Sequence, residues 1–189
     1  MSIKDEIRYA KSHPDPHGLL DKRAIPLKQS AYDQFATTAY NSLKAGLTRE
    51  IKYDLGFFSK KNFRYENEFY FEIGLRDYYR DGSYFNNGYI LDKSMQPDED
   101  GYRTHRTLIQ TCYWEDIRKA FTTLAEKLDS AGYDKVIMCS VHSSHKYKDF
   151  DFNKTSVEMF VGYLNSIGYG YSSQWKIRVV VNCDENGNI

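Results

Sequence analysis

Two histidines behind an apolar run are the residues of this chain whose spacing most suggests a metal site. The apolar run at residues 136–141 contains Cys139 and is followed by His142 and His145. Thiolate and imidazole are ligands that zinc prefers, so this C-x-x-H-x-x-H pattern could support metal-dependent hydrolysis. On an extended backbone, however, Cys139 and His142 point to opposite sides, and no further ligand is nominated nearby. We therefore expect Cys139 to be a buried apolar residue, the histidines to belong to a loop, and no metal or cofactor to be bound.

Acidic residues on one predicted strand are the second set that could do chemistry. Glu66, Glu68 and Glu72 share one face of an extended segment. Such carboxylates could hold a magnesium ion for phosphodiester hydrolysis. No lysine follows at the spacing of a nuclease, so we expect these glutamates to be solvent-facing strand residues. A metal-dependent hydrolase or nuclease, acting through the two histidines or these glutamates, is thus the alternative function.

Tyrosine is the component of the composition that most needs a reason. Aromatic residues make up 16% of the chain, with 17 tyrosines. Tyrosine and arginine are enriched at the centres of protein interfaces, because they combine a large contact area with a polar tip, and aromatic rings also stack on unpaired bases. Strands favour tyrosine as well, so several of these rings could simply cover the core. One predicted hairpin concentrates these residue types and is the predicted binding surface: Arg76, Tyr78, Tyr79, Arg80, Tyr84, Phe85 and Tyr89. A second aromatic group, Tyr169, Tyr171 and Trp175, adds to it.

The function that these observations predict is binding rather than catalysis. Neither a nucleophile elbow nor a glycine loop that opens a helix is found, so no acyl-transfer or nucleotide site is indicated. The predicted partner is a protein or a protein–nucleic-acid complex. A small, neutral, tyrosine-rich chain without a catalytic motif suggests an accessory protein of a phage or other mobile element, for example an anti-CRISPR-like inhibitor of a host defence nuclease. A homo-oligomer is compatible with the same sequence.

Length and charge bound the class of protein. The 189 residues fit one domain with a conventional core. Lysine plus arginine equals aspartate plus glutamate at 26 each, which argues against strong non-specific binding of nucleic acid. Three widely spaced cysteines suggest no disulfide framework, and the charged N-terminus and short apolar runs suggest neither a secretory signal nor a membrane span. We expect a soluble cytoplasmic protein without a membrane partner.

The N-terminal part divides into an arm and the start of a compact domain. Residues 1–29 are predicted to form a short helix at about residues 3–11 and an arm that Pro14, Pro16 and Pro26 make irregular. The domain is predicted to span residues 30–189. It begins with an amphipathic helix, for which Ser30 and Asp33 provide the start signal and Gly46 provides the end.

The rest of the domain alternates between strand and helix patterns. A period of two at residues 67–79, the turn signal at 80–82 and the returning segment at 83–91 predict an antiparallel hairpin. A weak strand at 102–110 precedes a helix at about 112–131, and residues 134–141 are predicted to be the most buried strand. Thr155 and Glu158 form a capping box for the last helix, and residues 174–182 form the last strand. The predicted class is therefore α+β, with long helices packed on a mixed, largely antiparallel sheet.

Overall fold

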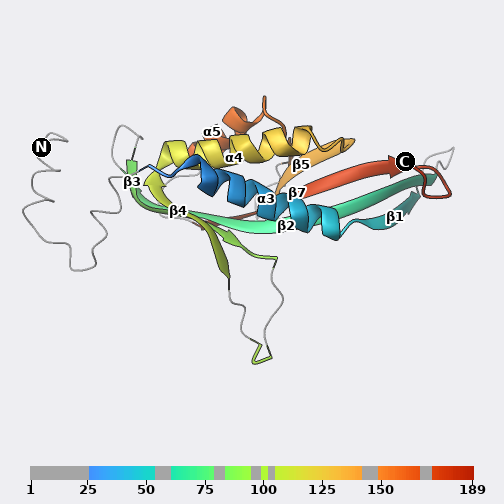
Figure 1. The fold of residues 1–189 in the computed structure, drawn as a ribbon, viewed down its shortest axis with the longest axis horizontal. Helices are drawn as coiled ribbons and strands as arrows, with labels where there is room; N and C mark the ends of the chain where they lie inside the picture. Colours follow the sequence, from blue (N-terminus) through green and yellow to red (C-terminus); the bar gives the residue numbers. More distant parts are fainter. Residues whose placement is uncertain are drawn as a thin grey trace, which may run out of the picture.

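The protein has an α+β fold, as its sequence predicts. The computed structural model describes residues 26–53, 61–78, 84–94, 99–101, 105–141, 149–166 and 172–189. In this part of the chain, three helices lie on one face of a seven-stranded sheet (Figure 1). The predicted helix at residues 3–11 and the arm before residue 26 lie outside the described residues.

The sheet is built around one long central strand. The strands are β1 (Thr48–Tyr53), β2 (Lys61–Tyr78), β3 (Tyr84–Asp92), β4 (Arg106–Tyr113), β5 (Lys135–Ser140), β6 (Asp149–Asp151) and β7 (Ser172–Cys183). Their order is β4-β3-β2-β7-β5-β6, and β1 pairs with the start of β2. The 18 residues of β2 allow it to pair with β7 along one side and with β1 and β3 in succession along the other. The predicted hairpin is thus confirmed as the β2–β3 pair.

Every strand pairing in the described residues is antiparallel, so the prediction of a mixed sheet was wrong. That prediction assumed that the helices of the C-terminal half connect neighbouring parallel strands. Instead, the helix after β4 carries the chain from one edge of the sheet across to β5, near the other edge. The chain then returns through β6 and a further helix, and β7 enters between β2 and β5, antiparallel to both.

Helix α3 (Gln29–Ala45) matches the predicted amphipathic helix, but its start signal differs from the prediction. Its buried residues follow the expected spacing: Tyr32, Phe35, Ala36, Ala39 and Leu43. Lys28 is the N-cap residue and makes no side-chain cap, so Ser30 and Asp33 do not form a capping box. The Asp33 carboxylate instead accepts a hydrogen bond from Gln29 Nε2 at 3.0 Å. The apolar periodicity therefore located this helix better than its polar start signal did.

Helix α4 (Trp114–Asp129) begins two residues later than predicted, because β4 runs directly into it. A buried carboxylate, Asp116, joins the elements at this junction. It accepts hydrogen bonds from Tyr32 Oη and from Thr111 Oγ1, the latter at 2.5 Å, and Leu27 N–H donates to it at 3.3 Å. Burial, followed by the hydrogen bond to Asp116, raises the pKa of Tyr32 far above its ordinary value. The Asp116 carboxylate therefore links the first turn of α4 to the end of β4 and to the start of α3 through hydrogen bonds.

The core lies between the three helices and the inner face of the sheet, and the Phe121 ring is its hub. This ring contacts Phe160 at a centroid distance of 5.0 Å and Phe35 and Phe71 at 5.7 Å each. It thereby joins α4 to α5, α3 and β2. Leu124 and Leu128 belong with it to the buried cluster that also contains Met138 of β5.

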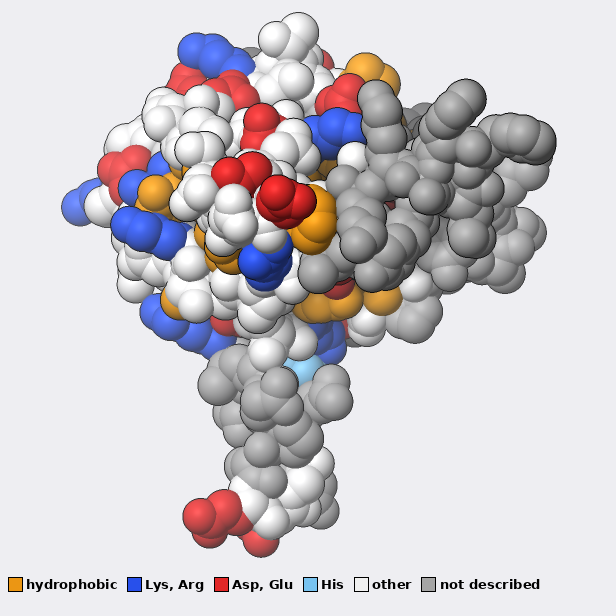
Figure 2. All heavy atoms as spheres, turned by 90° about the vertical axis from the view of Figure 1, so that its right-hand side faces the viewer, with side chains coloured by type: hydrophobic (Ala, Val, Ile, Leu, Met, Phe, Trp, Pro, Cys, Tyr) orange, Lys and Arg blue, Asp and Glu red, His pale blue; other side chains and the backbone are white. Residues whose placement is uncertain are grey.

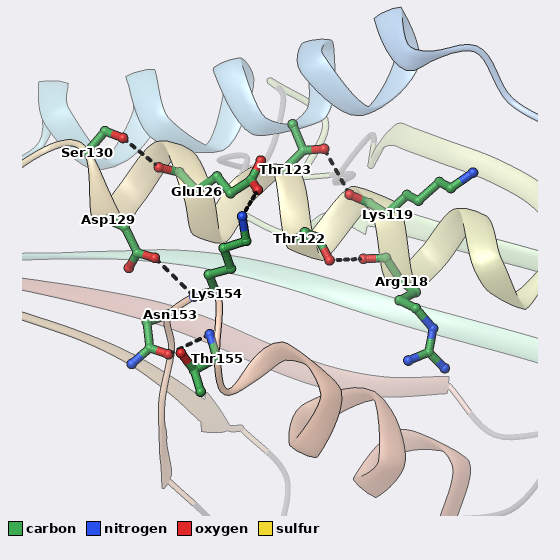
Figure 3. Close-up of polar contacts among 10 residues, drawn as sticks. All are labelled: Arg118, Lys119, Thr122, Thr123, Glu126, Asp129, Ser130, Asn153, Lys154 and Thr155. Atoms are coloured by element: carbon green, nitrogen blue, oxygen red, sulfur yellow. Dashed lines mark hydrogen bonds and ion pairs between the residues drawn. The ribbon is translucent and has the colours of Figure 1, made fainter.

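Helix α5 (Val157–Ser166) is held against α4 by polar contacts (Figure 3). Lys154 donates its backbone N–H to Asp129 Oδ2 at 3.0 Å, and its ammonium lies 2.7 Å from Glu126 Oε1. Asn153 Oδ1 accepts the backbone N–H of Thr155 at 3.0 Å (Figure 3). The predicted capping box at Thr155 and Glu158 is wrong, because Asn153 Oδ1 accepts the N–H groups of Thr155 and Ser156 in the turn before α5. Glu158 instead pairs with Arg118 of α4.

Strand β5 is not the most buried strand, contrary to the prediction. Met138 and Cys139 are buried, but Val136 and Ile137 are half-buried and Lys135 is exposed. A continuous apolar run predicts cover on both faces. Here the helices cover only one face, and β5 lies next to the three-residue edge strand β6. The central strands β2 and β7 carry more of the buried side chains.

Between β3 and β4 the chain makes an excursion away from the helices. Residues 99–101, with exposed Glu99 and Asp100, lie farthest from the helix layer, on the opposite side of the sheet (Figure 1). Figure 2 shows these acidic side chains at the tip of the projection. Among the described residues, no helix is long and apolar enough to cross a membrane.

Candidate functional site

The candidate functional site is the face of the sheet on which none of the described helices lies, and we call it the open face. Side chains alternate along β2 and β7, so the residues between those of the core point to this side. Cross-strand pairing places Glu68 opposite Arg178, Tyr70 opposite Lys176, and Glu72 opposite Gln174. These six residues define the centre of the open face: Glu68, Tyr70, Glu72, Gln174, Lys176 and Arg178. Polar and charged groups thus cover the side of the sheet that lacks helices.

Glu68 is the centre of one polar cluster on the open face. Lys176 Nζ lies 2.6 Å from Glu68 Oε1, and Tyr70 Oη donates to Glu68 Oε2 at 2.5 Å. The Lys176 ammonium also lies 5.6 Å from the centroid of the Tyr70 ring. Burial alone would raise the pKa of Glu68, but the hydrogen bonds from Lys176 and Tyr70 outweigh it and hold that pKa below its ordinary value. Glu68 is therefore a charged carboxylate, and each of its two oxygens accepts a hydrogen bond.

Glu72 is the centre of a second cluster, one step along the same strand. Lys93 Nζ lies 3.0 Å from Glu72 Oε2, and Tyr89 Oη donates to Glu72 Oε1 at 3.1 Å. Burial alone would raise the pKa of Glu72, but the hydrogen bond and charge of Lys93 lower it below its ordinary value. Only 9% of Glu72 is exposed, so the prediction of a solvent-facing residue was wrong here. The reason is that side chains of β3 and β7 cover it.

The third predicted glutamate, Glu66, lies in contact with Arg64, whose Nε is 2.5 Å from Glu66 Oε1. Each of the three glutamates therefore has a cationic neighbour, whereas a magnesium site needs carboxylate oxygens that are free to ligate. The described residues contain no group of three or more histidine, cysteine, aspartate or glutamate side chains placed to hold a metal ion. The arrangement of these glutamates thus suits ion pairing better than metal binding.

Cys139 is buried, with 4% of its surface exposed, as we expected for an apolar role. Burial, together with a hydrogen bond to Asp149, raises the pKa of its thiol to about 11. A thiol with a raised pKa is a poor nucleophile and a poor metal ligand, because both roles need the thiolate. His142 and His145 lie outside the described residues.

A cavity of about 220 Å³ opens in the same region. Its wall is formed by Tyr70, Phe71, Lys93, His105, Gln174 and Trp175. His105 Nδ1 is buried and has no hydrogen-bond partner within the described ranges. The cavity lies where the β3–β4 excursion leaves the sheet, since Lys93 directly follows β3 and His105 directly precedes β4. The cavity thus combines a cationic side chain, Lys93, with an imidazole nitrogen that has no partner among the described residues.

The predicted hairpin surface continues the sheet beyond the open face. Arg76 pairs with Asn87, and Tyr78 pairs with Phe85 across the β2–β3 ladder. For Arg76, Tyr78, Tyr84 and Phe85 the structure describes the backbone alone, and Tyr79 and Arg80 lie outside the described residues. Tyr89 is half-buried, and its ring lies on Gly74, where a Cβ atom would overlap it.

The second aromatic group was partly misassigned. Trp175 is only 1% exposed, and its ring packs on Phe160 at a centroid distance of 5.0 Å, so it belongs to the core. Tyr169 and Tyr171 lie outside the described residues. Strand alternation explains the error, because Trp175 points to the helices while its neighbours Gln174 and Lys176 point away.

The sequence analysis missed the cationic side of the candidate site. Lys93 and Lys176 come from distant segments, and their proximity to the β2 glutamates depends on strand order. One signal was present, since Gln174, Lys176 and Arg178 alternate with apolar residues along the last strand. That alternation predicts a polar face but does not identify the strand that will lie beside it.

Comparisons with known proteins return no match, either from the protein-family models, from the curated proteins or from the solved structures.

Proposed function

We propose that this chain is a non-enzymatic binding protein that holds a protein or a protein–nucleic-acid complex on its open face and on the adjoining β2–β3 hairpin. The observation that carries the proposal is the open face itself. Within the described part of the chain, the helices cover one side of the sheet, while the other presents the ion pairs of Glu68 and Glu72 beside a cavity. A surface in which both charge signs alternate in fixed positions favours selective recognition over general attraction to one sign of charge.

Partial exposure of the paired charges supports this function. The side chains of Lys176 and Glu68 are 25% and 28% exposed, so a partner can reach both without breaking the core. Arg178 Nε is buried and has no hydrogen-bond partner in the described part of the chain. Fixed side chains of this kind lose little conformational entropy on binding, which favours affinity.

The hairpin extends the same surface. The backbone of its positions 76–78 and 85–87 continues the β2–β3 ladder beyond Glu72, so the hairpin adjoins the open face. Tyrosine and arginine supply much of the binding energy in protein interfaces. Inhibition of a host defence nuclease is the specific form of this proposal, and it rests on the small size, zero net charge and tyrosine content of the chain.

The proposal is tested by affinity capture from the native host, followed by calorimetry of the captured partner with two matched double variants. Lys176→Gln with Arg178→Gln removes two positive charges from the open face. Lys44→Gln with Lys119→Gln removes two exposed positive charges from the helix layer. We expect the first variant to lose at least about tenfold in affinity, which corresponds to 1.4 kcal/mol, and the second to bind like the wild type.

A thermal melt of each variant accompanies the calorimetry, because Lys176→Gln also leaves Glu68 without its ion-pair partner. Equal affinity of both double variants, with unchanged melting temperatures, would place the contact surface elsewhere. Turnover of a nucleic-acid or ester substrate by the purified protein, abolished by a chelator, would instead favour the metal-dependent hydrolase.

A further inference from the structure

The cavity on the open face is framed by the two ends of the β3–β4 excursion. Asp92 pairs with Arg106 across the base of the excursion, so Lys93 and His105 leave the sheet side by side. The backbone N–H of Lys93 donates to the carbonyl oxygen of Tyr70 at 2.9 Å, which fastens Lys93 to the central strand. The polar wall of the cavity is therefore positioned by paired strands.

Lys93 supplies hydrogen-bond donors that remain free in this wall. Both oxygens of Glu72 are engaged, Oε1 by Tyr89 and Oε2 by Lys93, and Gln174 adds a further hydrogen bond to this carboxylate. An ammonium group has three N–H donors, and the ion pair with Glu72 uses one of those of Lys93. The imidazole of His105 adds a nitrogen that has no partner among the described residues. An acceptor in the cavity would therefore engage the remaining donors of Lys93, and that of His105 when the free nitrogen carries the proton.

We propose that this cavity receives the carboxylate of an acidic side chain, an aspartate or glutamate, of the partner protein. The proposal rests on the proposed function and names the chemistry that the open face recognises. The carboxylate accepts from Lys93 Nζ and from His105, while its aliphatic stem lies along the Tyr70 ring. A volume of about 220 Å³ accommodates such a side chain together with ordered water.

A carboxylate fits the local charge better than a phosphate does. Lys93 is already paired with Glu72, so the two charges nearly cancel at the wall of the cavity. A dianionic phosphate would meet the repulsion of Glu72 with no second full positive charge in the described wall to offset it. A single negative charge that accepts charge-assisted hydrogen bonds is the better match.

The test uses the full chain and three small probes, so it does not depend on knowing the partner. Glutamate blocked at both backbone ends, glutamine blocked in the same way, and inorganic phosphate are titrated separately. Binding is followed through the NMR signals of the His105 imidazole, which are assigned by comparison with a His105→Gln variant. We expect blocked glutamate to shift these signals to saturation, with at least severalfold weaker binding of blocked glutamine, because an uncharged amide forms no charge-assisted bond with Lys93.

Two variants examine the residues of the wall. Lys93→Gln should weaken the binding of blocked glutamate by about tenfold, the loss expected when a hydrogen bond to a charged group is removed. Lys119→Gln, on the helix layer, should leave it unchanged. If Lys93→Gln fails to fold, the His105→Gln variant, followed by calorimetry, should still show weaker binding.

Equal binding of the glutamate and glutamine probes, or binding that Lys93→Gln does not weaken, would overturn the proposal. Tighter binding of phosphate than of blocked glutamate would overturn the choice of a carboxylate. These outcomes are separate from the test of the proposed function, in which Lys176 and Arg178 are changed and the partner itself is measured. The open face could therefore bind its partner while the cavity fails to bind a carboxylate, and the two experiments would show this.

Discussion

Neighbouring residues of β2 serve opposite purposes, because successive side chains point to opposite faces of the sheet. Phe69 and Phe71 are completely buried beneath the helices. Glu68 and Glu72, each one residue away, form the ion pairs of the open face. Single substitutions should therefore separate stability from recognition according to the face on which they fall.

Phe121→Ala should destabilise the fold by about 3–5 kcal/mol, as expected when a fully buried ring is removed. The reason is that Phe121 packs on rings from α3, α5 and β2, so a cavity would open at the centre of the core. Chemical denaturation measures the effect. Met159→Ala is the control, since Met159 is 62% exposed, and it should change the stability by less than about 0.5 kcal/mol. If Phe121→Ala has the same denaturation midpoint as the wild type, the Phe121 ring does not lie at the centre of the core.

Gly74→Ala and Gly162→Ala should have opposite effects on stability. A methyl group at Gly74 overlaps the Tyr89 ring and would displace it from Glu72, for which we expect a cost of about 1–3 kcal/mol. Gly162 lies in α5 with nothing within 4 Å of its added Cβ, so alanine there should stabilise the helix by about 0.5–1 kcal/mol. Thermal melts of both variants measure the difference. Equal shifts would show that Tyr89 does not depend on the space above Gly74.

At the scale of elements, β2 contributes to the core, to the open face and to the hairpin. Its middle part supplies the core and the open face, and its end supplies the hairpin with β3. Among the described side chains of β2, Leu75 is the last that belongs to the core. Changes at the hairpin should therefore affect binding more than folding.

Combined substitution of Tyr79, Arg80 and Tyr84 by alanine should change stability by less than about 1 kcal/mol, as surface substitutions usually do. If the hairpin is the contact surface, each tyrosine should cost at least about 2 kcal/mol of affinity for the partner. Loss of the Arg80 contribution should also reduce the dependence of binding on salt, because screening acts on charge pairs. Calorimetry and melts are compared for each variant. Full affinity of the triple variant would exclude the hairpin, and unfolding would place the rings in the core.

At the scale of the whole molecule, the open face links stability to pH. The pKa values of Glu68 and Glu72 lie below the ordinary value of 4.5, since their hydrogen bonds and ion pairs outweigh burial. A lowered pKa in the folded state means that the charged carboxylate stabilises the fold above pH 4.5. This contribution is lost as the pH falls through the folded-state pKa.

The free energy of unfolding should therefore decrease as the pH falls below about 4.5, and it should decrease less in a Glu68→Gln, Glu72→Gln double variant. Denaturant titrations at several pH values measure both slopes. The double variant should be less stable than the wild type at neutral pH and approach it in acid. A pH dependence equal to that of the wild type would show that these carboxylates are not the groups whose protonation weakens the fold.

The sequence by itself determined the local elements and the sidedness of the sheet. Periods of three and four in the amphipathic helices, and of two in β2 and β3, reflect burial on one face, which any folded arrangement of this chain must satisfy. For that reason the α+β class, the core role of Phe121 and the β2–β3 hairpin were predictable. The helix caps were less predictable, because a cap such as Asn153 is chosen among several polar residues by the path of the loop.

Only the tertiary structure decided which strands are neighbours, and the candidate site depends on that choice. Strand order is set by how the helices cross the sheet, a non-local property that periodicity does not encode. Once β7 lies beside β2, Lys176 meets Glu68, and once β4 pairs with β3, Lys93 and His105 line one cavity with Tyr70. The glutamates were visible in the sequence as a row of charges. Their cationic partners, and the cavity between them, come from segments that are far apart in the sequence and adjacent only in the fold.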